Sequence, residues 1–317
     1  MLSSPAQMHV PDGFLTTTVS IVLWVLAVLA IVVALRRVGN DLGERQVPLM
    51  GVLAACIFAG QMLNFPVAGG TSGHLIGAAL AAILLGPWAG ILVLACVTGI
   101  QALIFQDGGL LAMGSNIVNM GVVSVFTAWG VYRIVQMAAR GARWGMIVGG
   151  FAAAWISVVV ASMAAALQLA ASGASPANVA IPTMAGVHML IGIGEGLITV
   201  GALSFLAATR RDLVSHDKTA AVAGRGVWIA GLVLAIGLAV ASPLASTHPD
   251  GLERVAADIG FLDRAQSSPY KIFSDYMIPG IHNQALSTIV AGVVGVLLVF
   301  VVAYGVARMR RGANTAS

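Results

Sequence analysis

Long stretches without a charged side chain are the feature that most constrains how this chain can fold. No Asp, Glu, Lys or Arg occurs in the segments 13–35, 46–106, 108–132, 144–194, 196–209, 226–249 and 276–307. A membrane-spanning helix needs about 20 mostly apolar residues, so the longest segments hold more than one helix. None of them shows the alternation of apolar and polar residues that is typical of a membrane β-barrel. We therefore expect an all-α integral membrane protein.

Composition excludes several other classes of protein. Hydrophobic residues make up 59% of the chain and charged residues 9%, whereas about 25% of a soluble domain is charged. The 2 cysteines exclude a disulfide-stabilised secreted scaffold. The net charge of +4 comes from scattered residues and not from a dense basic patch, so we expect membrane lipid around the protein and no nucleic acid partner.

The charge-free segments divide into nine predicted membrane spans, of which the third is short for a full crossing. They are 17–35, 47–64, 74–86, 88–105, 116–136, 145–171, 182–207, 227–242 and 285–307. With nine spans, only Arg254, Arg264 and Lys271 fall on one side, so 13 of the 16 Lys and Arg share the other. The positive-inside rule assigns that richer side to the cytoplasm. This predicts an external N-terminus and an internal C-terminus.

A polar segment divides the chain into two predicted parts. Residues 1–208 form a body with seven spans, residues 209–226 form a cytoplasmic linker, and residues 227–317 form a module with two spans. These two spans flank an external loop, 243–284, which is rich in charge compared with the rest of the chain.

Polar residues within the apolar segments gather near the predicted outer face. They are His9, Asp12, Asn64, His74, Gln101, Asp107, Asn116, Asn119, His188 and Glu195. Polar groups at membrane depth are costly and commonly line a cavity or pathway. The alternative is that each one hydrogen-bonds a neighbouring helix. Histidines favour the functional interpretation, because neutral imidazole is the commonest protein ligand of borderline divalent metals.

Four motifs resemble those of the CbiM/NikM family, the substrate-binding membrane components of energy-coupling-factor cobalt and nickel importers. They are MHVPDGFL (8–15), GGTSGHLIG (69–77), QALIFQDGGLLAMGSNIVNMGVV (101–123) and HMLIGIGEGLIT (188–199). The segments HPDGLERVAADIGF (248–261) and DYMIPGI (275–281) resemble the PDGLE-type accessory component called NikN. The whole chain is thus similar to a fused protein of the NikMN type.

The resemblance implies a metal site at Met8, His9 and His74. In the family the N-terminal amine, the backbone nitrogen of the following histidine and two imidazoles hold the metal. Here MLSSPAQ precedes Met8, and an internal Met has no free amine, so we expect the metal-loaded protein to begin at Met8. Supporting roles are expected for Asp12, Asp107, Asn116, Asn119, His188 and Glu195.

The resemblance also implies the transported substrate and the partners. The substrate is Ni²⁺, favoured by the PDGLE-type module, or Co²⁺ taken up for cobalamin biosynthesis, and no prosthetic group is expected. The expected partners are a transmembrane coupling protein of the CbiQ/NikQ type and ATPases of the CbiO/NikO type. This chain has no Walker A motif of its own.

A membrane enzyme and a self-sufficient secondary transporter are the two alternatives to substrate capture. A membrane enzyme would need a catalytic constellation, and neither an HExxH nor a GxSxG motif occurs. A self-sufficient secondary transporter commonly carries an internal inverted repeat, and we find none. Co-purification with ATPase subunits would distinguish the importer component from both.

Overall fold

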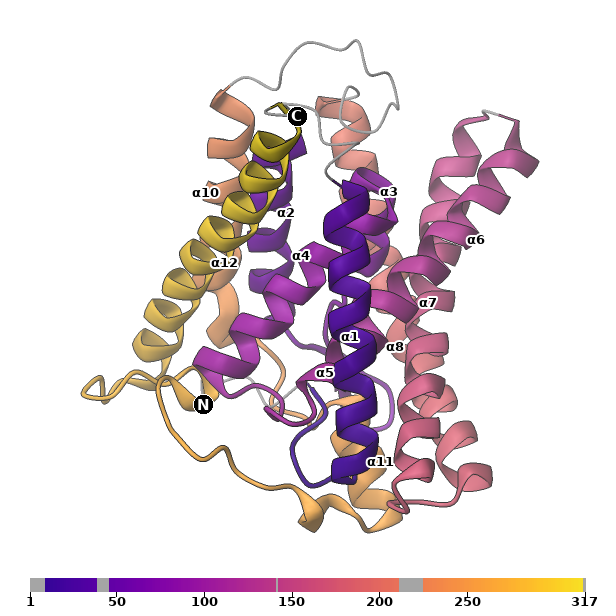
Figure 1. Cartoon of the computed structure of the whole chain (residues 1–317), viewed down its shortest axis with the longest axis vertical. Helices are drawn as coiled ribbons and strands as arrows, with labels where there is room; N and C mark the ends of the chain where they lie inside the picture. The colour runs from indigo at the N-terminus through magenta and orange to yellow at the C-terminus, as the bar shows by residue number, and fades with distance from the viewer. Residues whose placement is uncertain (1–8, 39–45, 141, 211–224, 316–317) are drawn as a thin grey trace.

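The computed structural model describes residues 9–38, 46–140, 142–210 and 225–315, which are mostly helical (Figure 1). The α-helices are α1 Thr17–Val38, α2 Gln46–Gln61, α3 Ala78–Leu85, α4 Pro87–Ile100, α5 Met113–Asn116, α6 Ser124–Ala139, α7 Arg143–Ala171, α8 Ala177–Thr209, α10 Arg225–Ala241, α11 Gly251–Ile259 and α12 Gln284–Thr315. Two π-helical segments, η1 Gln101–Phe105 and η2 Ile117–Val123, continue α4 and precede α6. Short 3₁₀ turns occupy η3 Ser242–Leu244, η4 Leu262–Arg264 and η5 Ser274–Tyr276.

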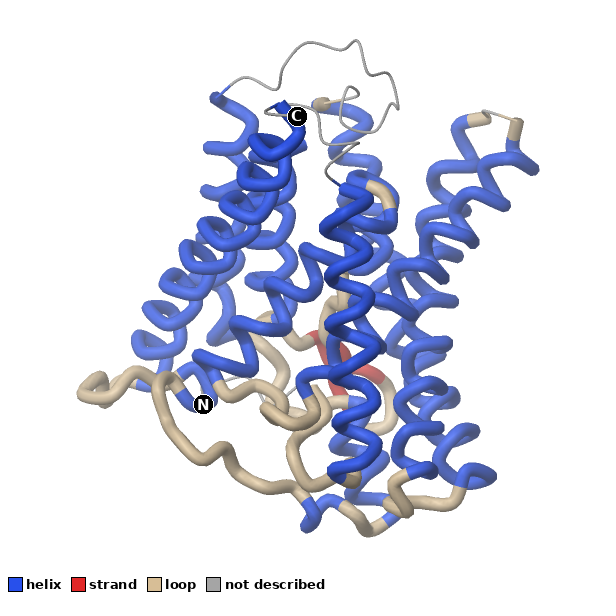
Figure 2. The backbone as a smooth tube through the Cα atoms, in the orientation of Figure 1, coloured by secondary structure: helices blue, strands red, loops and turns tan. Residues whose placement is uncertain are grey.

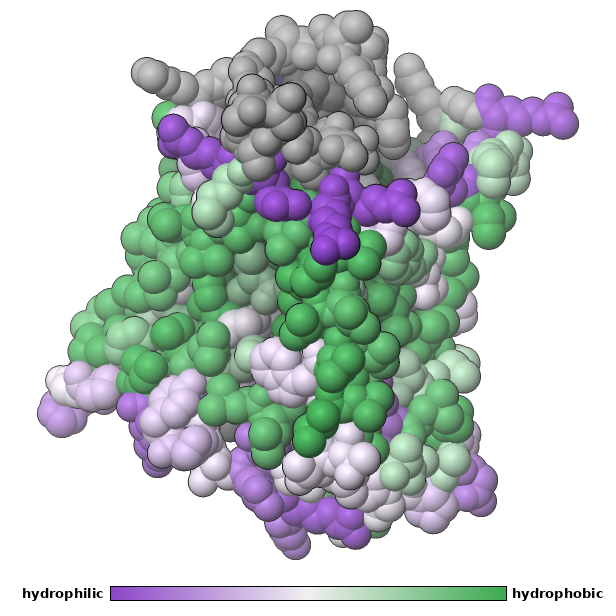
Figure 3. Space-filling model, in the orientation of Figure 1, coloured by the Kyte–Doolittle hydropathy of each residue, from purple (hydrophilic) through white to green (hydrophobic). Residues whose placement is uncertain are grey.

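The described helices make this a multi-pass membrane protein. Six stretches are long and apolar enough to cross a membrane: Thr17–Val38, Pro87–Phe105, Met113–Ala139, Trp144–Ala171, Ala177–Thr209 and Gln284–Arg310. Two apolar helices, Gln46–Gln61 and Trp228–Leu244, are shorter. On the face shown in Figure 3, apolar side chains form a band across the middle of the molecule, and hydrophilic ones gather toward both ends. Such a band matches the hydrocarbon layer of a membrane.

Each span predicted from the sequence falls on a helix, but the third differs most from its prediction. The sequence predicted a span over 74–86, whereas α3 covers Ala78–Leu85. An eight-residue helix rises about 12 Å, well short of the roughly 30 Å hydrocarbon layer. The residues before it form a hairpin and an extended segment that carries His74.

The hairpin pairs β1 Phe65–Val67 with β2 Thr71–Gly73 in antiparallel register, with Phe65 opposite Gly73 (Figure 2). Gly69 and Gly70 in its turn have φ of 85° and 73°. Only glycine adopts consecutive positive φ readily, and this backbone matches the twist of a tight hairpin. The glycine-rich sequence therefore turns the chain back so that β2 leads directly into His74.

The two predicted parts of the chain share one core. Helix α2 packs against both α10 and α12, and Met50, Phe58, Ala235 and Val296 belong to the same buried cluster. Gly295 lies so close to Phe58 that an added Cβ would approach its ring to within 2.2 Å. Small residues let membrane helices approach closely where no hydrophobic driving force draws them together.

A second core lies at the lower end of Figure 1, where α11 and the segment after it cross beneath the helices. Phe14, Leu23 and Leu169 from the body pack there with Val255 and Phe261. The backbone amide of Gln266 donates to the carbonyl of Asp12 over 2.8 Å. The loop between α10 and α12 is therefore docked along the N-terminal segment that carries His9.

Candidate metal centre

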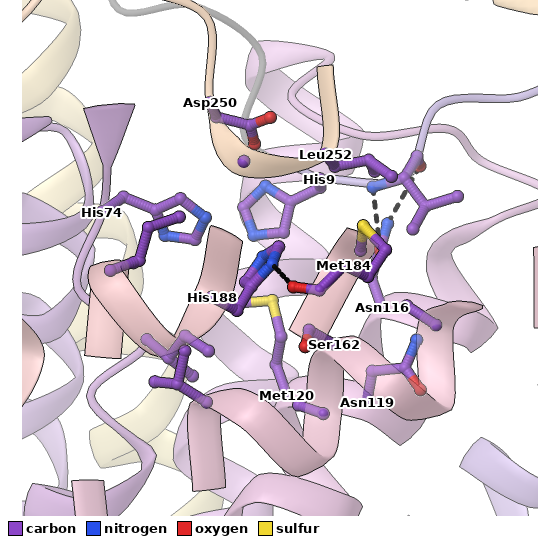
Figure 4. A pocket seen from close by; sticks show the side chains of 17 residues that line it. His9, His74, Asn116, Asn119, Met120, Ser162, Met184, His188, Asp250 and Leu252 are labelled. Carbon is purple, nitrogen blue, oxygen red and sulfur yellow. Dashed lines mark hydrogen bonds between the residues drawn. The ribbon is translucent and has the colours of Figure 1, made fainter. Parts of the chain in front are cut away.

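A cavity of about 80 Å³ lies between the N-terminal segment, the segment after β2, α7, α8 and the start of α11 (Figure 4). Its polar and sulfur-bearing lining consists of His9, His74, Asn116, Asn119, Met120, Ser162, Met184, His188 and Asp250. Three of the six histidines in the chain therefore face one space.

His9 presents one imidazole nitrogen without a partner. Its Nδ1 lies 2.9 Å from Asp107 Oδ1, and the side chain is buried. Its Nε2 is also buried and has no hydrogen-bond partner among the described residues. Because the carboxylate can only accept, Nδ1 carries the proton and Nε2 carries the free lone pair. A buried nitrogen of this kind normally finds a partner, and a metal ion is one that suits imidazole.

His74 lies beside His9 at a separation that a shared metal ion allows. The ring centres are 5.9 Å apart, with 39° between the ring planes. An imidazole nitrogen binds a divalent ion such as zinc at about 2.1 Å, so two rings sharing an ion have centres up to roughly 6.4 Å apart. Burial, and then the neighbouring His9, lower the pKa of His74 to about 4. The ring is therefore neutral at neutral pH, which is the form that binds metals.

His188 on α8 is the third histidine of the cavity. Its Nδ1 lies 2.8 Å from the carbonyl oxygen of Met184, one turn earlier on the helix. Since a carbonyl only accepts, Nδ1 donates this bond and Nε2 keeps its lone pair. An added Cβ on Gly251 would lie 3.1 Å from that Nε2, so the start of α11 covers His188.

Asn116 and Asp12, for which the sequence predicts supporting roles, both bond the N-terminal segment to the segment around residues 110–116. The Asn116 side chain accepts from the Val10 amide at 3.0 Å and donates to the Val10 carbonyl at 3.1 Å. Asp12 accepts from the backbone amides of Leu110 and Ala112 at 3.0 Å and 2.9 Å. These bonds fix His9 between two elements that are distant in the sequence.

Glu195, also expected to support the site, holds the His74 segment through its backbone. The carboxylate accepts from the amides of Ile76 and Gly77 at 2.9 Å and 3.0 Å and is buried. These amides lie directly before α3, where helix amides lack partners within the helix. Glu195 thus joins α8 to the start of α3, two residues after His74.

We predict that Glu195→Gln lowers protein stability by about 1–3 kcal/mol, because an amide side chain offers one acceptor oxygen where two buried backbone amides need one each. The measurement is the unfolding midpoint of the purified protein in detergent. Asp258→Asn is the matched control, since Asp258 is exposed and pairs with Arg254 on the same helix. An unchanged midpoint for Glu195→Gln would contradict the assigned role.

Asn119 fits the alternative interpretation of a helix–helix hydrogen bond. It lines the cavity, but its side chain exchanges hydrogen bonds with Gln168 on α7 at 3.0 Å and 2.6 Å. Three residues at or beside the cavity, Gln168, Met120 and Met184, are not predicted from the sequence. The thioether of methionine is only a weak hydrogen-bond acceptor. Nothing in the sequence around Met120 or Met184 distinguishes these methionines from ordinary core residues.

The turn at residues 248–252, here called the HPDGL turn, closes one side of the cavity. Ser72 donates from its amide to the Pro249 carbonyl over 2.8 Å and from its hydroxyl to the His248 carbonyl over 2.9 Å. Asp250 caps α11 by accepting from the Glu253 amide over 2.7 Å. Asp250, Gly251 and Leu252 all line the cavity. The turn is thus bonded to the strand that precedes His74.

The described residues supply some, but not all, of the donor atoms that a metal ion would need. Within residues 9–38, 46–140, 142–210 and 225–315, no three His, Cys, Asp or Glu side chains stand close enough together to form a complete metal-binding group. Met8, the remaining predicted ligand, lies outside the described residues.

Fold and cavity together define a class: a multi-pass helical membrane protein with an imidazole-lined cavity closed by a loop from its C-terminal part. Residues 9–213 match the family model described as the cobalt uptake substrate-specific transmembrane region, CbiM, and residues 225–312 match the PDGLE domain. The chain belongs to the CbiM family and carries a PDGLE domain, as its motifs predicted.

Relatives with both parts are transport proteins by name. The chain is 35% identical over 309 residues to a putative fused nickel transport protein, NikMN, of Archaeoglobus fulgidus, covering 96% of this chain and 100% of the relative. It is 34% identical to the fused nickel transport protein NikMN of Rhodobacter capsulatus, covering 69% of this chain and 67% of the relative. A crystal structure of a truncated transition metal transporter is similar with 33% identity and a TM-score of 0.57, covering 63% of this chain and 99% of that structure.

Proposed function

We propose that this protein captures Ni²⁺ for uptake across the membrane, as the substrate-binding component of an ATP-driven importer of the energy-coupling-factor type. The observation that carries this proposal is the unpartnered Nε2 of His9 in a cavity beside His74. The fused relatives are named as nickel transport proteins, which supports transport rather than catalysis. Hydrolysis of ATP is assigned to separate ATPase subunits.

His9 and His74 are the proposed central ligands, with Met8 as the third residue of the set and His188 as the next candidate. The contact with Asp107 favours Nε2 of His9 as the donor, because Nδ1 is already engaged. A small chelate ring that included the His9 backbone nitrogen would use Nδ1 instead. The ring would then have to leave Asp107 before the metal bound.

The role of Met8 depends on a free amine, whose pKa near 7.7–8.0 makes it a far better donor than an internal amide. We predict that metal-loaded protein from native expression starts at Met8. Intact-mass analysis checks this directly. Residues 1–7 on fully loaded protein would contradict the amine ligand and leave His188 as the replacement donor.

Ni²⁺ is proposed over Co²⁺ on the names of the fused relatives. Uptake of Co²⁺ for cobalamin biosynthesis is the second candidate, because a relative in Sorangium cellulosum, 31% identical over 172 residues, is named cobalt transport protein CbiM. Both ions accept imidazole nitrogen. Competition between Ni²⁺ and Co²⁺ for the purified protein distinguishes the two candidates.

The proposed topology has nine crossings, the third made by the segment 65–77 together with α3 and not by a helix alone. The N-terminus is proposed to lie outside, the C-terminus inside, and the metal to be captured from the outer side of a prokaryotic cytoplasmic membrane. The guanidinium of Arg310 near the end of α12 donates to the Leu35 carbonyl near the end of α1 over 2.8 Å. Arg37 lies 5.9 Å from the ring of Trp88, at the start of α4. These contacts support one shared basic end, which the positive-inside rule assigns to the cytoplasm. The proposed division into 1–208, a linker at 209–226 and 227–317 follows the same scheme.

Uptake into cells tests the proposed function. Cells that lack other nickel importers should accumulate Ni²⁺ when they express this protein with a CbiQ/NikQ-type coupling protein and CbiO/NikO-type ATPases. An inactive ATPase should abolish the accumulation, and the subunits should co-purify. Equal uptake by this chain alone would favour a self-sufficient transporter and contradict the proposal.

A further inference from the structure

We propose that Asp250 of the PDGLE domain supplies negative charge that balances the captured cation. This inference rests on the proposed function and gives the PDGLE domain a task within the metal site. The proposed nitrogen donors His9 and His74 come from the CbiM part of the chain, whereas Asp250 reaches the same cavity from the HPDGL turn. The two parts of the protein thus contribute different chemistry to one site.

Asp250 lies in the wall of the cavity with its carboxyl group held in place. Of the described residues that line the cavity, it is the only acidic one, and it is 3% exposed. Figure 4 shows its side chain near the rings of His9 and His74. The carboxylate accepts from the Glu253 amide over 2.7 Å. A carboxylate has about four acceptor sites, so this bond leaves it able to face a cation as well.

A cation in this cavity needs a negative charge close by. Neutral imidazoles donate lone pairs but bring no charge, and a buried charge without a partner is costly. The other polar side chains of the lining, from Asn and Ser residues, are uncharged. Burial, and to a lesser extent Glu253, raise the pKa of Asp250 to about 7, whereas a positive charge on His9 lowers it. A cation beside His9 therefore stabilises the ionised carboxylate of Asp250, and the carboxylate stabilises the cation in return.

The amino end of α11 gives a second reason for a negative charge at this position. An added Cβ on Gly251 would lie 3.1 Å from His188 Nε2, so the first turn of α11 lies against the lining of the cavity. Amides at the start of a helix carry partial positive charge, which repels a cation. A carboxylate at the N-cap offsets that charge, and Asp250 occupies the N-cap of α11. Without the charge of Asp250, the turn that closes the cavity would repel the ion that it covers.

Substitutions at Asp250 can remove the charge and keep the helix cap. Asn and Ser cap helices about as well as Asp, whereas Ala does not. The test therefore compares Asp250→Asn, Asp250→Ser and Asp250→Ala in the full-length purified protein, with Ni²⁺ alone as the probe. Asp258→Asn is the matched control, because Asp258 is an exposed acid on the same helix. The measurements are the Kd for Ni²⁺ and the unfolding midpoint of the metal-free protein.

We expect the Kd for Ni²⁺ to rise about 10–100-fold for all three Asp250 variants, the range typical of a lost outer partner of a metal site. The unfolding midpoint of the metal-free protein should fall only for Asp250→Ala, because only this variant also loses the cap. Asp258→Asn should bind Ni²⁺ within about twofold of the unaltered protein.

Binding of Ni²⁺ by Asp250→Asn and Asp250→Ser within about twofold of the unaltered protein would overturn the inference. Weakened binding by Asp250→Ala alone would do the same, since that pattern assigns Asp250 a capping role without a charge effect. Equal weakening by Asp258→Asn would also overturn it, because any acid on α11 would then have the same effect. Failure of the unaltered protein to bind Ni²⁺ or Co²⁺ would instead overturn the proposed function itself.

Discussion

His74→Ala should abolish tight binding of Ni²⁺ and Co²⁺ while the protein still folds and inserts into the membrane. The substitution removes an imidazole whose ring centre lies 5.9 Å from that of His9. We expect a loss of more than about 100-fold, beyond the effect of removing an outer-shell partner. Folding should survive because the side chain is only partly buried and the one hydrogen bond described for it, over 3.3 Å to the Leu75 carbonyl, is weak. Equilibrium metal binding and the unfolding midpoint of the purified variant are the measurements.

His282→Ala is the matched control for this experiment. His282 is exposed and does not line the cavity, so its removal should leave metal binding unchanged. If His74→Ala retained the full metal content of the unaltered protein, His74 would be excluded from the site.

Gly251→Val should weaken metal binding on the order of tenfold by displacing the HPDGL turn from the cavity. A Cβ at Gly251 would lie 2.6 Å from Ile191 Cδ1 and 2.9 Å from His188 Cε1. The added side chain therefore forces α11 away from α8, and Asp250 and Leu252 move with it. The dissociation rate of Ni²⁺ should rise, because the cavity loses its cover.

Gly237→Val tests whether the effect is specific to the turn. Gly237 lies on α10 of the same domain, and a Cβ there would meet nothing within 4 Å. This variant should release Ni²⁺ at the rate of the unaltered protein. If Gly251→Val released Ni²⁺ no faster than Gly237→Val, the HPDGL turn would not be a cover of the site.

The positions of the long helices were predictable because lipid imposes one requirement on all of them. Any charge-free run of sufficient length must satisfy its backbone internally, and α7 and α8 accordingly fall where such runs were found. The segment before α3 did not follow this rule. Residues 65–77 form a hairpin whose turn is exposed, followed by an extended stretch that is mostly buried. In this stretch Glu195 accepts from backbone amides that lipid could not satisfy, and the Ser72 hydroxyl donates to the His248 carbonyl.

The centre of the candidate site was predictable, but its supports were only partly so. His9 and His74 stand in motifs with a recognisable pattern, and the structure brings their rings together. Asp107 could be expected near the outer face, yet its partners could not, because Tyr276 lies 169 residues away in sequence. Long-range pairs of this kind leave no local signal in a single sequence. Asp250 was equally ambiguous, since a Pro-Asp-Gly turn looks the same whether or not it covers a cavity.

X-ray absorption spectroscopy of the Ni²⁺-loaded protein tests the central claim most directly. The account predicts a first shell of nitrogen donors with outer-shell scattering from imidazole, and a loss of part of that imidazole scattering in His9→Ala and in His74→Ala. A first shell of water oxygens without imidazole scattering, or a spectrum that neither substitution changes, would contradict a metal site between His9 and His74.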